Sequence, residues 1–139
     1  MTLETRTIQP FPAQRTALVT GAGAPRGIGR RVVRKLVAEG WNVAAADIDG
    51  AAVEEFAAEL SAELPAQSDV AVIGVGVDIS DQASVDAAFA RIDAELPQVV
   101  GLVNLAGIPS PHSFFELTSE IWDRVMDVNA KGKIGRAHV

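Results

Sequence analysis

The segment TGAGAPRGIGR, from Thr20 to Arg30, holds the residue types whose spacing points most directly to chemistry. Its glycines let the backbone turn sharply and approach a ligand closely, and free N–H groups at the start of a helix attract an anion. No Lys-Ser or Lys-Thr pair follows Gly29, so the segment is not the phosphate loop of a nucleoside-triphosphate-binding protein. Two interpretations remain at this point: an anion-binding loop, or a glycine-rich turn without a ligand.

Asp47 ends a short apolar run and follows the glycine loop by about 20 residues, the interval at which a carboxylate accepts hydrogen bonds from ribose hydroxyls. A glycine loop and an acid in this order suit a dinucleotide better than a nucleoside triphosphate. A calcium loop is a weaker interpretation of DIDG, residues 47–50, because Ala51 and Ala58 occupy positions where oxygen ligands belong. We therefore expect a dinucleotide site and no metal site.

These residues need a scaffold, and the rest of the chain predicts one. Short apolar runs typical of buried strands alternate with apolar residues at helical spacing. Gly40 ends the first helical pattern, Pro65 follows the second, Ser80 is the expected N-cap of the third, and Thr118 is that of the fourth. The predicted strands cover residues 17–20, 43–47, 70–77 and 99–107, and the helical patterns cover residues 28–39, 53–64, 81–96 and 119–131.

Strands that alternate with helices of this length predict right-handed crossovers and a parallel sheet covered on both faces. The fold class that we expect is α/β, a Rossmann-type doubly wound parallel sheet, truncated after the fourth strand and the helix that follows it. Residues 1–14 are expected to form a mobile N-terminal arm, and residues 15–132 an incomplete cofactor-binding domain.

The composition excludes several other classes of protein. The formal net charge is −6, whereas nucleic-acid binding needs a basic surface. The chain has no cysteine, no apolar run of the roughly 20 residues that span a membrane, and no signal-peptide pattern. We expect a cytoplasmic protein that binds neither nucleic acid nor membrane. The basic residues Arg30, Arg31, Arg34 and Lys35 are expected to form the solvated face of a helix.

Five motifs in a fixed order make the signal specific: TGAGAPRGIG, Asp47, VDIS (77–80), NLAG (104–107) and WDRVMDVN (122–129). With this order and spacing the chain resembles the short-chain dehydrogenase/reductase family, classical type, over residues 15–132. The resemblance implies a nicotinamide cofactor and hydride transfer between that cofactor and a carbonyl or alcohol substrate. It also implies that a full-length parent protein forms a homo-oligomer.

The resemblance assigns expected roles by matching position. The motif glycines would line the pyrophosphate, Asp47 would hold the adenosine ribose, and Asp78 with Ile79 would flank the adenine. Asn129 matches the helix asparagine that supports a proton relay, and it is the catalytic residue that we expect here. The cofactor-binding residues expected on this basis are Gly21, Arg26, Gly27, Ile28, Gly29, Asp47, Asp78, Ile79, Asn104, Ala106 and Gly107.

The sequence departs from the family pattern at two places in the site. Five residues separate Gly21 from Gly27, so the loop is longer than usual. Leu105 replaces an asparagine, so one structural hydrogen bond must be lost or replaced.

The choice between NAD and NADP rests on two opposed charges. Arg26 is the type of residue that accompanies the 2′-phosphate of NADP in the family, while the carboxylate of Asp47 would repel that phosphate. In a tight pocket, the repulsion between Asp47 and the phosphate outweighs the attraction that a mobile surface arginine provides. We therefore expect NAD as cofactor, with NADP less favoured.

The family's catalytic tyrosine and lysine, in the pattern YxxxK, have no match, because the 139-residue sequence contains no tyrosine. We expect the chain as given to be inactive. Residues 133–139, KIGRAHV, match the translation of a common sequencing-adapter string, and we interpret them as an artefactual tail. A non-catalytic dinucleotide-binding module is the alternative function. A methyltransferase with a similar glycine loop is disfavoured by the NLAG motif and by the DVN of the last helix.

Overall fold

The computed structural model describes residues 12–134. The expected N-terminal arm (1–14) and tail (133–139) therefore lie mostly outside the described residues. The strands are β1 (Thr16–Thr20), β2 (Asn42–Asp47), β3 (Val72–Gly76) and β4 (Val99–Asn104). The α-helices are α1 (Ile28–Ala38), α2 (Gly50–Glu63), α3 (Gln82–Glu95) and α4 (Ser119–Asn129), and two short 3₁₀ helices are η1 (Phe114–Glu116) and η2 (Lys131–Lys133).

The four strands form one parallel sheet in the order β3-β2-β1-β4. Thr20 pairs in register with Ala46 on one side and Asn104 on the other, and Asp47 pairs with Gly76. The carboxyl ends of all four strands therefore lie at the same end of the sheet. From β1 the chain continues on one side to β2 and β3 and then crosses to the other side of β1 at β4. The carboxyl ends of β1 and β4 therefore form the topological switch point of a doubly wound sheet. The predicted fold class is confirmed.

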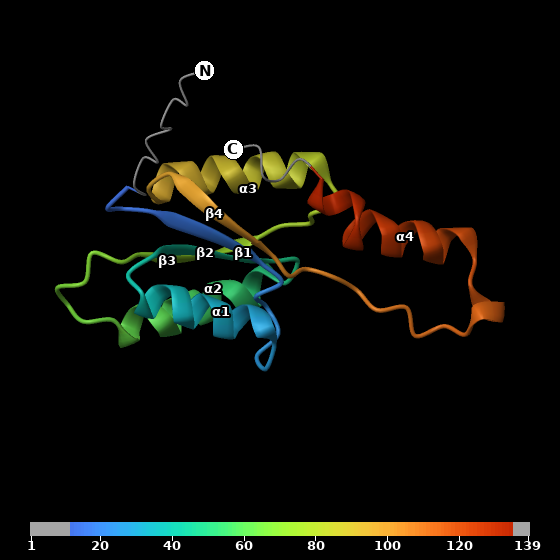
Figure 1. Ribbon diagram of the computed structural model, residues 1–139, viewed down its shortest axis with the longest axis horizontal. Helices are drawn as coiled ribbons and strands as arrows, with labels where there is room; N and C mark the ends of the chain where they lie inside the picture. The colour runs from blue at the N-terminus through green and yellow to red at the C-terminus, as the bar shows by residue number, and fades with distance from the viewer. Residues whose placement is uncertain (1–11, 135–139) are drawn as a thin grey trace, which may run out of the picture.

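The sheet separates two apolar layers, because successive strand residues point to opposite faces. Figure 1 shows α3 on one face and α1 with α2 on the other. Leu18 and Ala44 belong to the layer under α3, whereas Val19 and Val43 belong to the layer under α1 and α2. Phe56 of α2 is fully buried in the second layer. These layers fix the positions of the strand ends at which the expected site residues lie.

Most element ends agree with the prediction, and one cap differs. Gly40 has a positive φ of 81° just after α1, and α2 ends before Pro65 as expected. The prediction of Ser80 as N-cap of α3 was wrong, since Asp81 is the cap and accepts hydrogen bonds from the backbone of Ala83 and Ser84. The physical reason is that the helix begins one residue later, at Gln82, so Asp81 stands next to its free N–H groups, while the Ser80 hydroxyl donates back to Asp78 at 2.6 Å.

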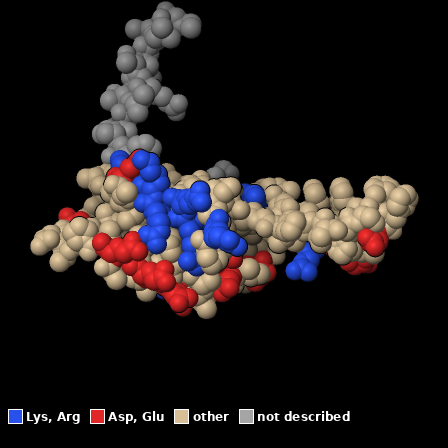
Figure 2. All heavy atoms as spheres, turned by 90° about the horizontal axis from the view of Figure 1, so that it is seen from below, with Lys and Arg blue, Asp and Glu red and all other residues tan. Residues whose placement is uncertain are grey.

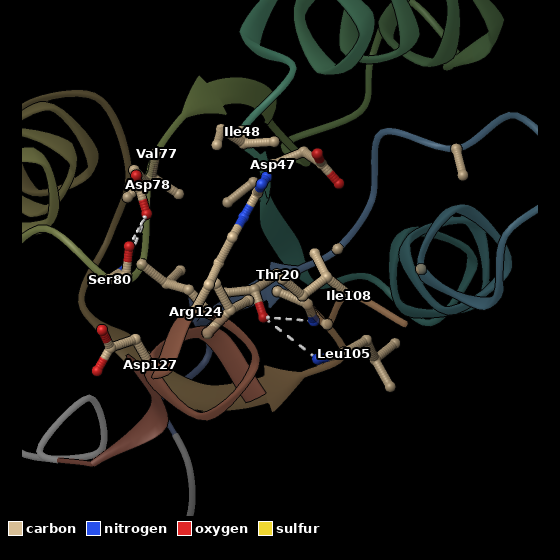
Figure 3. Close-up of a pocket in the computed structure, with 18 of the residues that line it drawn as sticks. Thr20, Asp47, Ile48, Val77, Asp78, Ser80, Leu105, Ile108, Arg124 and Asp127 are labelled. Carbon is tan, nitrogen blue, oxygen red and sulfur yellow. Dashed lines mark hydrogen bonds between the residues drawn. The ribbon is translucent and has the colours of Figure 1, made fainter. Parts of the chain in front are cut away.

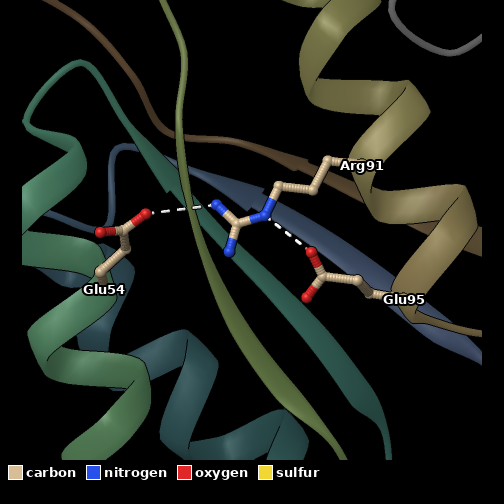
Figure 4. A network of polar contacts seen from close by, with 3 residues as sticks. All are labelled: Glu54, Arg91 and Glu95. Carbon is tan, nitrogen blue, oxygen red and sulfur yellow. Dashed lines mark hydrogen bonds and ion pairs between the residues drawn. The ribbon is translucent and has the colours of Figure 1, made fainter.

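Arg91 connects the two faces of the sheet around β3, which lies at one edge (Figure 4). From α3 its guanidinium contacts Glu95 on the same helix at 2.8 Å and Glu54 on α2 at 3.2 Å. These carboxylates, Glu95 foremost, raise the pKa of Arg91 above its ordinary value, against the opposing effect of desolvation. Side chains that pass over the edge of a sheet also discourage pairing with another chain at that edge.

The basic residues of α1 lie beside the carboxylates of α2 on the face seen in Figure 2. Arg31, Arg34 and Lys35 are exposed, as expected for a solvated helix face. Arg34 forms an ion pair with Glu63 at 2.7 Å. The prediction was wrong for Arg30, because its side chain bonds two backbone carbonyl groups instead of facing solvent.

Candidate functional site

A cleft of about 790 Å³ lies at the carboxyl edge of the sheet. It is bounded by the glycine loop after β1, the ends of β2 and β3, the segment after β4, and helix α4 (Figure 3). A cleft at the switch point of a parallel sheet is where this class of fold binds its ligands. Nine of the expected site residues line it: Gly21, Gly27, Ile28, Gly29, Asp47, Asp78, Ile79, Ala106 and Gly107.

The glycine loop owes its shape to backbone approaches that a side chain would block. Gly21 has a φ of 76°, in the left-handed region, and a Cβ there would lie 2.6 Å from the backbone carbon of Leu105. A Cβ at Gly29 would collide with the backbone of Gly21 and Ala22. The loop therefore packs against the segment after β4 and against the start of α1, which leaves the N-terminus of α1 facing the cleft.

Asp47 stands at the end of β2, and its carboxylate contacts the loop directly. Oδ2 accepts the N–H of Gly23 at 2.8 Å, and Oδ1 accepts the N–H of Asp49 at 3.2 Å. A carboxylate oxygen offers two lone pairs, so each oxygen keeps acceptor capacity toward a ligand hydroxyl. The acid and the glycine loop, distant in sequence, thus form one wall of the cleft.

Thr20 connects the glycine loop to the segment after β4. Its hydroxyl accepts the N–H groups of Leu105 and Ala106, each at 3.2 Å, and the side chain is 5% exposed (Figure 3). These bonds hold the backbone of the NLAG motif although the usual second asparagine is Leu105, whose side chain is 37% exposed. Thr20 was not among the expected site residues, although its place before the first motif glycine was a usable signal.

Asp78 follows β3 and lines the cleft with its carboxylate bound locally. Its Oδ1 accepts the hydroxyl of Ser80 at 2.6 Å and the backbone N–H of Ser80 at 2.9 Å. The hydroxyl bond, followed by the backbone bond, lowers the pKa of Asp78 below its ordinary value of 3.8. The carboxylate is therefore ionised at neutral pH.

Helix α4 contributes charge to the cleft, although none of its charged residues was among the expected site residues. Glu120, Asp123 and Asp127 line it together with Arg124, whose guanidinium extends toward Asp47 and Ile48 (Figure 3). A hydrogen bond with the Thr118 side chain, followed by one with its own backbone, lowers the pKa of Glu120. The periodicity of α4 indicated a helix, but nothing in it indicated which of its faces lines the cleft.

Three expected site residues lie apart from the lining of the cleft. Arg26 is exposed at the tip of the loop, and Asn104 lines a small apolar cavity under α3. The amide of Asn129 bonds the backbone of Ile108 twice, donating to its carbonyl and accepting its N–H, both at 2.8 Å. Asn129 therefore joins α4 to the segment after β4.

The described part of the chain, residues 12–134, holds no group of three or more side chains suited to a metal ion. Over the same residues, no helix is long and apolar enough to cross a membrane.

Comparison with known proteins gives consistent results. The family model described as short chain dehydrogenase matches residues 15–137. Over 122 residues the chain is 34% identical to 2,3-dihydro-2,3-dihydroxybenzoate dehydrogenase of Bacillus subtilis, and over 123 residues it is 39% identical to (3R)-3-hydroxyacyl-CoA dehydrogenase of Mus musculus. Each match covers 84% of this chain, but 42% of the Bacillus protein and 45% of the mouse protein.

Two further relatives extend the comparison. The chain is 40% identical over 101 residues to a Xanthobacter autotrophicus protein named inactive 2-(S)-hydroxypropyl-CoM dehydrogenase 2. That match covers 73% of this chain and 40% of the Xanthobacter protein. A solved structure from Novosphingobium aromaticivorans, described as a short-chain dehydrogenase, superposes with a TM-score of 0.74 at 33% identity. The superposition covers 85% of this chain and 41% of the Novosphingobium chain.

The chain belongs to the short-chain dehydrogenase family, and the resemblance seen in the sequence is confirmed. It spans about two fifths of the length of these relatives. Members of this family are oxidoreductases that use NAD or NADP.

Proposed function

We propose that this chain binds NAD in preference to NADP and forms the cofactor-binding part of an oxidoreductase. In that protein, hydride passes between the nicotinamide and a small carbonyl or alcohol substrate. The parent protein acts in the cytoplasm as a homo-oligomer. The expected site residues that line the cleft would bind the dinucleotide, with the motif glycines at the pyrophosphate and Asp78 with Ile79 at the adenine.

The observation that carries the proposal is the position of Asp47. Its carboxylate lies at the end of β2, in the same cleft as the N-terminus of α1, so one ligand can reach both. A pyrophosphate suits the free N–H groups of a helix start, and ribose hydroxyls suit a carboxylate. This pairing distinguishes a dinucleotide from a ligand that carries phosphate alone.

The charge of the cleft supports NAD over NADP. Asp47, Asp78, Glu120, Asp123 and Asp127 line it, and Arg124 is the one cationic side chain among its described lining residues. The 2′-phosphate of NADP would bring about two further negative charges into this field. Arg26, the residue expected to receive that phosphate, is exposed outside the lining.

The cofactor supplies the hydride when it is bound, and this chain's residues bind and orient it. Asn129 holds the backbone of Ile108 through two hydrogen bonds, which supports the wall beside the nicotinamide end. The proton transfer that accompanies hydride transfer needs an acid or base, and the family's tyrosine is missing from the 139 residues. The chain as given is therefore expected to bind cofactor without turnover.

Isothermal titration of NAD and of S-adenosylmethionine into the full chain tests this proposal. We expect saturable binding of NAD and no heat from S-adenosylmethionine. Binding of S-adenosylmethionine without binding of NAD would favour the methyltransferase and contradict the proposal.

A non-catalytic dinucleotide-binding module is the second candidate. The similarity to a Xanthobacter protein named inactive favours it. Sequencing the source locus past the codon for Gly132 separates the two candidates. A reading frame that continues into a YxxxK motif would favour the enzyme, whereas KIGRAHV followed by a stop codon would favour the module and contradict an artefactual tail.

A further inference from the structure

We propose that Arg30 is a positioning residue for the cofactor, because it fixes the glycine loop at Gly23 and thereby orients Asp47. The inference rests on the proposed function. Arg30 does not line the cleft, so its effect on a ligand passes through the backbone of the loop.

Gly23 is held by a side chain at each of its polar backbone groups. Its N–H donates to Oδ2 of Asp47 at 2.8 Å, and its carbonyl accepts a hydrogen bond from Nη2 of Arg30 at 3.0 Å. The same Nη2 donates to the carbonyl of Ala52, in the first turn of α2, at 3.2 Å. Arg30 thus connects the loop to α2, and Asp47 connects it to β2.

The surroundings of the guanidinium are those of a structural cation. Its central carbon lies 4.6 Å from the ring centroid of Phe56, a side chain that is 1% exposed. The Nε atom is buried and has no hydrogen-bond partner among the described residues. Removing a cation from water is costly unless other contacts offset it. Here the two carbonyl bonds and the aromatic face provide that compensation.

The length of the loop explains why such an anchor matters. The tip, residues 24–26, is exposed, and a hydrogen bond from the N–H of Gly27 to the carbonyl of Ala24 at 2.9 Å closes it. A longer loop has more conformations to lose on ordering. Gly23 is the last buried residue before this exposed tip, and the contacts of Arg30 and Asp47 restrict it there. A loop that is ordered before binding leaves a smaller entropy cost for the ligand.

Arg34 offers a matched control within the same helix. It is also an arginine of α1, and its guanidinium carbon lies 5.4 Å from the same Phe56 ring. Its hydrogen bonds go to Glu63 of α2 and not to the loop. Arg30→Met and Arg34→Met both remove one charge and one contact with Phe56, but only Arg30→Met removes the bond to Gly23.

The test compares both variants with the wild-type chain by NAD titration, urea unfolding and amide hydrogen exchange at Gly23. We expect Arg30→Met to weaken NAD binding about tenfold and to speed exchange at Gly23. Arg34→Met should stay within about twofold of wild type in both measurements. Urea unfolding shows whether weaker NAD binding or faster exchange follows from lower global stability. If Arg30→Met does not fold, Arg30→Gln takes its place.

Equal NAD affinity and equal Gly23 exchange in the two methionine variants would overturn the role of Arg30. If the wild-type chain binds no dinucleotide, the proposed function fails, but exchange at Gly23 still decides whether Arg30 orders the loop. Faster exchange in Arg30→Met alone would support the anchor, and unchanged exchange would refute it.

Discussion

The backbone N–H of Gly23 donates to Oδ2 of Asp47 at 2.8 Å, a bond between residues 24 positions apart in the chain. It joins the glycine loop after β1 to the end of β2. The loop, proposed to bind the pyrophosphate, and the Asp47 carboxylate, proposed to bind the ribose, are therefore held in a fixed position relative to each other. A change that moves Gly23 therefore alters or breaks a hydrogen bond that holds the carboxylate.

Gly23→Ala should weaken NAD binding more than it destabilises the fold. The φ of Gly23 is not positive, so alanine fits its backbone, but a Cβ would lie 2.7 Å from Cγ of Asp47 and displace the carboxylate. Gly40→Ala is the reverse control, since it lies at a φ of 81° with no atom within 4 Å of its Cβ. The left-handed backbone should make alanine cost about 1 kcal/mol of stability and leave NAD affinity unchanged. Titration and urea unfolding check both variants, and equal NAD affinity in Gly23→Ala and wild type would contradict the expectation.

Much of the fold could be predicted from local patterns in the sequence. Apolar runs marked β1 and β2, Gly40 and Pro65 marked the ends of two helices, and Thr118 was correctly expected to cap α4, where it accepts the N–H of Ile121. These signals lie within a few residues of the feature they specify. The prediction of the cap of α3 was wrong because Ser80 and Asp81 are both good N-cap residues, and the local sequence does not specify at which of them the helix begins.

The contacts that shape the site depend on tertiary structure and were not visible in the sequence. Arg30 belongs to a basic run typical of a solvated helix, and only the position of α2 gives its side chain the carbonyl of Ala52. Thr20 meets Leu105 because β1 and β4 are neighbours in the sheet, although they are distant in sequence. Such pairings follow from the strand order, which hydrophobic periodicity does not specify.

Thr20→Val should destabilise the chain by about 1–3 kcal/mol, because it leaves the N–H groups of Leu105 and Ala106 without their shared acceptor. Thr20→Ser keeps the hydroxyl and should retain most of the stability. Chemical unfolding of the two variants beside wild type measures the difference. A valine variant as stable as the serine variant would show that the hydroxyl contributes nothing.

Asn129→Asp should loosen the segment after β4. The carboxylate can still accept the N–H of Ile108, but it cannot donate to the carbonyl of that residue, which it would instead repel. The expected loss of stability is about 1 kcal/mol, together with faster hydrogen exchange at Ile108. Unchanged exchange at Ile108 would mean that the second bond does not hold the segment.

Ser80→Ala should raise the pKa of Asp78 toward its ordinary value of 3.8, because the hydroxyl bond is the largest cause of the lowered value. The folded pKa lies below the unfolded one, so the stability from this pair is present above the unfolded pKa. It is lost as the pH falls through the folded pKa. Carboxyl NMR titration measures the shift, and Glu116, whose lowered pKa comes from Ser113, should not respond. A pKa of Asp78 that stays low in Ser80→Ala would contradict this assignment.

The most direct test of the NAD site at Asp47 is a parallel titration of NAD and NADP into the wild-type chain and into Asp47→Asn. Asparagine keeps the size of the side chain and removes the charge that would repel a 2′-phosphate. We predict tighter binding of NAD than of NADP by the wild type, and a preference for NAD that shrinks by about tenfold or more in Asp47→Asn. Tighter binding of NADP by the wild type, or the same preference in both proteins, would contradict the role assigned to Asp47.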